Sequence, residues 1–154
     1  MTDNNTHTTP RPGAGHKKLN RFVGAWHTKG QTKVGANGEA LLITGTDTYE
    51  WLPGGFFLVH RWDVRMGSEE SKGIEIIGYD DKTKAYPTYS FDNQGNTGTY
   101  QASTRDGVWT FRSRSERATV VMSDDGNTII ANWEHLTDGI NWQPWMEVKL
   151  QRAG

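Results

Sequence analysis

The chain has 154 residues, seven of them Trp, and its formal net charge is −1. This length favours a single domain. The Lys and Arg residues are scattered, which argues against the basic surface of a nucleic-acid-binding protein and against a polybasic membrane patch. The chain contains no Cys, so disulfides and thiolate metal sites are excluded.

The first fifteen residues, MTDNNTHTTPRPGAG, are predicted to be a flexible tail, and residues 16–154 a single domain. The tail has no apolar segment typical of a signal peptide, and no apolar run in the chain is long enough to span a membrane. A cytoplasmic protein is therefore expected.

Residues 16–22 are predicted to form a short helix, because Leu19, Phe22 and Val23 have the spacing of one apolar helix face. This helix is expected to close one end of the structure. Ten stretches of β-forming residues follow, separated by turn sequences such as Asn37-Gly38 and Asp106-Gly107. The predicted strands are 24–34, 40–52, 55–66, 69–79, 84–92, 96–103, 107–114, 116–123, 127–137 and 142–152.

Evenly spaced turns predict that strands adjacent in the sequence are also adjacent in space. A long meander removes its unpaired edges by closing on itself. The predicted fold is therefore all-β: a closed antiparallel up-and-down barrel of about ten strands with a short N-terminal helix.

Period-two alternation assigns the inward faces of three strands. The residues expected to face inward are Phe56, Leu58, His60, Trp62 and Val64, then Ile129, Ala131, Trp133 and His135, and finally Trp142, Pro144, Met146, Val148, Leu150 and Arg152. The second, fifth and sixth strands are rich in Thr, Ser and Tyr, and their inward faces stay open. Such ambiguity is typical of a partly polar barrel interior.

Gly24-Ala25-Trp26 near the start and Arg152 near the end resemble the signature of lipocalin-like (calycin) barrels. The resemblance implies structural roles, with Trp26 plugging the barrel base and Arg152 packing over its ring. The segments HKKLNRFVGAWH, LPGGFFLVHRWD and IIGYDDKTKAY are also similar to a bacterial family of lipocalin-like barrels, which implies the fold but assigns no site. Nitrobindin, a ten-stranded haem barrel, is a more distant comparison. Its haem-binding His lies near the C-terminus, whereas residues 142–152 contain no His, so no cofactor is expected.

His60 and His135 are the candidate catalytic residues, since an inward imidazole can bind a ligand or transfer a proton near neutral pH. The alternative is that each is a buried histidine with a structural hydrogen bond. Trp62, Trp133, Trp142 and Met146 are candidate walls of a ligand pocket, and the alternative for them is core packing. His and carboxylate spacing predicts no metal site.

The sequence thus favours a barrel that binds a small hydrophobic or aromatic molecule, with no nucleic-acid or membrane partner. The alternative is a cofactor-free enzyme of cyclase, isomerase or hydrolase type that uses an interior His as general acid and base. Outward Trp145, Phe57 and Val59 form a candidate dimer surface, so a homodimer is a further expectation.

Overall fold

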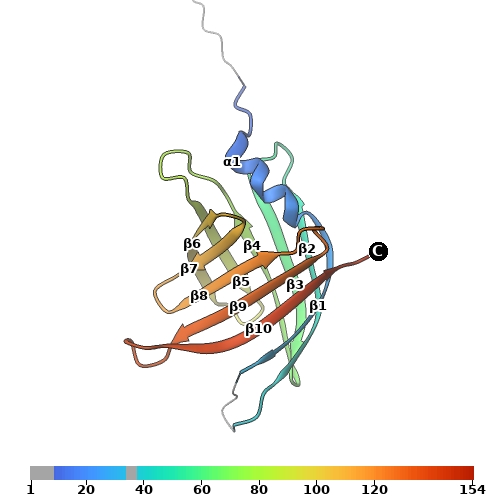
Figure 1. Ribbon diagram of the computed structural model, residues 1–154, viewed down its shortest axis with the longest axis vertical. Coiled ribbons are helices and arrows are strands. Elements are labelled where there is room, and N and C mark those ends of the chain that lie inside the picture. Colours follow the sequence, from blue (N-terminus) through green and yellow to red (C-terminus); the bar gives the residue numbers. More distant parts are fainter. Residues whose placement is uncertain (1–8, 34–37) are drawn as a thin grey trace, which may run out of the picture.

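A computed structural model describes residues 9–33 and 38–154. It confirms the predicted fold: ten antiparallel strands in sequence order form a closed barrel (Figure 1). The strands are β1 (Gly24–Thr32), β2 (Leu42–Trp51), β3 (Leu58–Met66), β4 (Glu69–Ile77), β5 (Tyr86–Asp92), β6 (Thr97–Arg105), β7 (Val108–Arg112), β8 (Glu116–Met122), β9 (Thr128–Leu136) and β10 (Trp142–Arg152).

Short turns between consecutive strands produce this order. Between β6 and β7, Arg105 pairs with Val108, so Asp106 and Gly107 alone make the turn. Both have positive φ, 53° and 81°, as a two-residue turn of this kind requires. The Asn37-Gly38 turn predicted between the first two strands falls partly outside the described residues.

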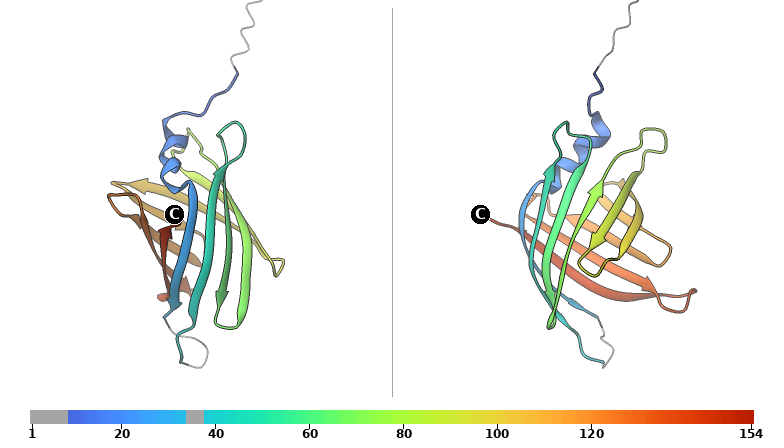
Figure 2. Two further views of the ribbon diagram at one scale, coloured as in Figure 1. Left: turned by 90° about the vertical axis from the view of Figure 1, so that its right-hand side faces the viewer. Right: turned by 180° about the vertical axis from the view of Figure 1, so that it is seen from behind.

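A short helical segment fills one end of the barrel, as expected (Figure 2). It consists of α1 (Ala14–Lys17) and the 3-10 helix η1 (Lys18–Phe22), so it begins two residues earlier than predicted. Leu19 and Phe22 are almost fully buried against the core. The Tyr86 hydroxyl donates a hydrogen bond of 2.6 Å to the Gly15 carbonyl, which ties the segment to β5. Of the predicted tail, residues 1–15, the first eight lie outside the described residues.

Beneath this plug, apolar side chains from most of the strands form the core. Its fully or nearly fully buried members include Trp26, Leu58, Ile77, Tyr86, Trp109 and Ile129. Pairing of β1 with β10 closes the barrel and sets Trp26 opposite Arg152. The opposite end, bounded by the turns at residues 67–68, 93–96 and 113–115, is called the open end below.

A β-bulge in β10 changes which side chains face inward. The pairing of β10 with β9 shifts between Pro144 and Met146, so Trp145 has no partner in the register. Met146, Val148 and Leu150 keep the predicted inward face, and Trp145 also lines the interior. Before the bulge, the inward and outward faces of β10 are exchanged relative to the prediction. The inward position predicted for Trp142 is therefore wrong: its ring packs under Arg117, whose guanidinium carbon lies 4.2 Å from the ring centre.

The predicted dimer surface does not form as a patch. Val59 is only 3% exposed and Trp145 lines the interior, which leaves Phe57, 49% exposed, as the one exposed member of the three.

Candidate functional site

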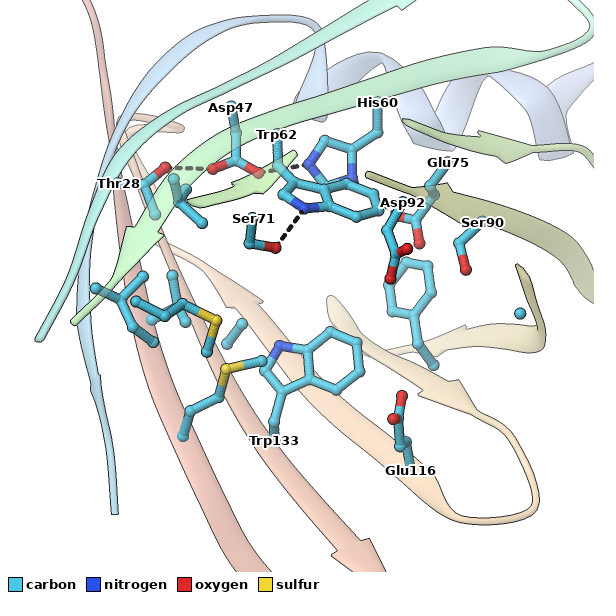
Figure 3. Close-up of a pocket in the computed structure, with 18 of the residues that line it drawn as sticks. Thr28, Asp47, His60, Trp62, Ser71, Glu75, Ser90, Asp92, Glu116 and Trp133 are labelled. Atoms are coloured by element: carbon cyan, nitrogen blue, oxygen red, sulfur yellow. Dashed lines mark hydrogen bonds and ion pairs between the residues drawn. The ribbon is translucent and has the colours of Figure 1, made fainter. Parts of the chain in front are cut away.

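A cavity of about 590 Å³ occupies the barrel between the plug and the open end. Its lining residues come from every strand of the barrel, from Phe22 of η1 and from the turn after β5. The volume falls in the range of small-molecule sites. The cavity wall combines large aromatic side chains with a chain of polar groups (Figure 3).

The polar groups on one wall form a continuous hydrogen-bonded chain. Thr28 donates from its hydroxyl to Asp47 Oδ1. Asp47 Oδ2 lies 2.5 Å from Nε2 of His60, and Nδ1 of the same ring lies 2.9 Å from Glu75 Oε1. Both nitrogens of the imidazole are therefore engaged by carboxylates, and the ring can donate to both only as the imidazolium.

Strand register brings these residues together. His60 pairs directly with Tyr49 of β2 on one side and with Glu75 of β4 on the other. Asp47 lies two residues before Tyr49 on the same face, which places it diagonally opposite His60. Four neighbouring strands each contribute one member of the chain, because inward residues of paired strands stand side by side.

The two carboxylates hold His60 in its charged form. Burial alone would lower the pKa of His60, but the hydrogen bonds and charges of Asp47 and Glu75 outweigh it and raise this pKa from 6.5 to about 9. The Tyr49 ring stacks on the imidazole, with centroids 4.1 Å apart and planes 3° apart. Burial, followed by the charges of Asp47 and Glu75, raises the pKa of Tyr49 well above its usual value, so its hydroxyl stays protonated.

Trp62 forms the next part of this wall. Its Nε1 donates a hydrogen bond of 3.1 Å to the Ser71 hydroxyl. Its cross-strand partner is Gly73, where an added Cβ would come within 2.2 Å of the indole. The ring lies flat across β4 because Gly73 has no side chain.

The facing wall contains Tyr100, Glu116, Trp133, Trp145 and Met146. The Tyr100 hydroxyl donates to Glu116 Oε2. The pKa of Tyr100 is raised by burial first, and then by Glu116 and by the charge of Glu75. Trp133 meets Trp145 edge to face, with centroids 5.9 Å apart. Glu75 and Glu116 thus both act on Tyr100 from opposite walls.

Four of the six predicted site residues line this cavity: His60, Trp62, Trp133 and Met146. His135 does not line it. Its ring stacks on Trp145 at 5.3 Å, in the half of β9 nearer the open end. Trp142 lies outside the cavity under Arg117.

The sequence prediction missed the partners of His60. Asp47 belongs to the second strand, whose inward and outward faces could not be assigned. Nothing in the sequence around Glu75 marks it as a hydrogen-bond partner of His60. Once His60 is placed inward, the hairpin connecting β3 and β4 fixes Glu75 opposite it. The position of that turn in the sequence was therefore the signal that could have identified Glu75 as a partner of His60.

No three His, Cys, Asp or Glu residues within the described ranges are arranged to hold a metal ion. His60 has no free nitrogen to coordinate one. No helix in the same part of the chain is long and apolar enough to cross a membrane.

Comparison with known proteins places the chain in a family. Residues 11–152 match the family model described as "Protein of unknown function (DUF1579)". The chain belongs to this family. A search of curated protein sequences gives no match.

Two solved structures share the fold of this DUF1579 protein. Rv2717c from M. tuberculosis is 12% identical with a TM-score of 0.66, and the alignment covers 92% of this chain and 99% of that one. The S-type phycobiliprotein lyase CPES from Guillardia theta is 9% identical with a TM-score of 0.64, covering 90% and 92%. At this identity the likeness establishes the fold alone.

Proposed function

We propose that the barrel binds a small molecule with an apolar or aromatic body in its interior, as the lipocalin-like barrels that the sequence resembles would suggest. The observation that carries this proposal is the cavity of about 590 Å³, which is walled by Trp62, Trp133, Trp145 and Met146 and leads to the open end. Removing the apolar surface of a ligand from water there would supply affinity of about 25 cal/mol per Å².

The arrangement of His60 favours binding over acid–base catalysis. A general base needs a free nitrogen at the working pH. Both nitrogens of His60 lie against carboxylates, and its pKa of about 9 keeps the ring charged at neutral pH. The Asp47–His60–Glu75 chain therefore acts as a fixed polar surface toward which a ligand can be oriented.

Filling the cavity tests the proposal. Val148 lies on its wall between Gly30 of β1 and Ala131 of β9, so a larger side chain has small neighbours on both sides. Val148→Phe should abolish saturable binding of apolar fluorescent probes while the unfolding transition remains cooperative. Val121→Phe, at an outward position that is 45% exposed, is the matched control and should bind as wild type does. Unchanged binding by Val148→Phe, or no saturable binding by wild type, would reject the proposal.

A further inference from the structure

The cavity carries an excess of one sign of charge. Six carboxylate residues line it, and among the described lining residues there is no Lys or Arg, so His60 is the one cationic group. The six are Asp47, Glu69, Glu70, Glu75, Asp92 and Glu116. We propose that the ligand carries a positively charged amine or amidine group joined to its aromatic or apolar body, an inference that rests on the proposed binding function.

Three of these carboxylates, Asp47, Glu75 and Glu116, differ in how fully the protein satisfies their oxygens. Asp47 uses one oxygen for Thr28 and the other for His60, so its hydrogen bonds are complete within the protein. Glu75 uses only Oε1, for His60, and Glu116 uses only Oε2, for Tyr100. No described residue donates a hydrogen bond to the second oxygen of either glutamate. Each carboxylate can accept more than one hydrogen bond, and an ammonium group has three donors to offer.

These two glutamates line different sides of the interior. Figure 3 shows Glu75 with Asp92 on one side of the cavity and Glu116 beside Trp133 on the other. Both glutamates act on the Tyr100 hydroxyl, because Glu116 and Glu75 each add to the rise in its pKa that burial causes. The proposed cation lies between these two walls.

The formal charges of the innermost carboxylates are only partly balanced within the protein, which leaves two of them uncompensated. Asp47, Glu75 and Glu116 contribute three negative charges, and the His60 imidazolium offsets one of them. Like charges in a partly enclosed site repel, whereas a bound cation relieves that repulsion. A ligand with its own carboxylate would add to it.

The aromatic wall suits the same chemistry. The faces of Trp62, Trp133 and Trp145 are electron-rich, and a cation placed over an indole is attracted to the ring face. At the open end, Glu69 extends the negative potential toward solvent, which would attract cations at low ionic strength, whereas Glu70 is paired with Arg65.

Three probes of similar shape separate charge from apolar burial: naphthylmethylamine, which is cationic, naphthylmethanol, which is neutral, and naphthoate, which is anionic. Calorimetric titration into wild type should give an affinity for the amine at least about tenfold above that for the alcohol, the ratio of one charge-assisted hydrogen bond. Naphthoate should bind more weakly than the alcohol. Raising the ionic strength should weaken the amine alone.

Glu116→Gln should remove most of the amine's advantage and leave the alcohol unchanged, because the amide oxygen can still accept from Tyr100. Glu50→Gln, an exposed glutamate paired with Arg61 on the outer surface, is the control and should bind all three probes as wild type does.

Equal affinity for amine and alcohol in wild type would overturn the charge inference, and an amine preference undiminished in Glu116→Gln would overturn the placement of the cation beside Glu116. If the alcohol binds and Val148→Phe abolishes that binding, the proposed binding function stands without it. If none of the three probes binds, both fail.

Discussion

The guanidinium carbon of Arg152 lies 4.2 Å from the centre of the Trp26 ring. Arg152 also donates hydrogen bonds to the carbonyls of Arg21, Val23 and Gly126. Trp26 is fully buried and donates from Nε1 to the Phe22 carbonyl at 2.9 Å. One side chain of the last strand thus joins the first strand, the end of the helical plug and the turn after β8.

Arg152→Ala should therefore destabilise the barrel by about 2–4 kcal/mol, the combined loss of a cation–π contact and of several hydrogen bonds to backbone carbonyls. Arg152→Lys should recover part of the loss, because it keeps the charge but not the planar fork. Urea unfolding measures the difference. Arg65→Ala, which removes an exposed arginine paired with Glu70, is the control and should cost no more than about 0.5 kcal/mol.

The charge on His60 predicts how stability depends on pH. Its pKa is raised from 6.5 to about 9 in the fold, so its stabilising contribution is complete below pH 6.5 and is lost as the pH rises through about 9. The part lost should be on the order of 3 kcal/mol. Urea unfolding of wild type and His60→Gln across this interval, with the difference taken at each pH, measures it. Parallel curves for the two proteins would contradict the assignment.

Thr28 should contribute to the stability of the protein through its hydroxyl group rather than through its shape. It is 5% exposed and donates to Asp47. Thr28→Val keeps the volume but removes the donor, and should destabilise the protein by about 1–3 kcal/mol. Thr28→Ser keeps the donor and should lose less. If the two variants are equally stable, Asp47 does not depend on this hydrogen bond.

Gly73 should not tolerate a side chain. A Cβ there would lie 2.2 Å from the Trp62 indole, so Gly73→Ala must displace this ring from the cavity wall. The expected cost is about 1–3 kcal/mol, with a changed tryptophan emission spectrum. Gly13→Ala is the control, since nothing lies within 4 Å of its added Cβ. A spectrum identical to that of wild type would show that Trp62 does not need this space.

Turn chemistry made the fold predictable from the sequence. Residue types such as Asp106-Gly107 adopt positive φ with little strain, and evenly spaced turns leave an antiparallel meander as the simplest arrangement. Strict alternation then placed His60 and Trp62 inward in β3 and Trp133 inward in β9.

Alternation failed where a strand is irregular. The bulge at Trp145 adds one residue to β10 relative to β9, so every residue before it changes face. No pattern of apolar residues around Trp142 and Trp145 marks such an insertion. The polar partners of His60 were hidden for another reason: Asp47 lies among Thr and Tyr residues in β2, where composition does not separate the inner from the outer face.

The plug of Leu19 and Phe22 also has a kinetic consequence. Because these side chains fill one end of the barrel, a bound molecule would arrive and depart past the hairpins at the other end. The residence time of a bound molecule would then depend on how those hairpins move, so substitutions in the turn at residues 113–115, which do not line the cavity, should change its dissociation rate without altering the wall that holds it.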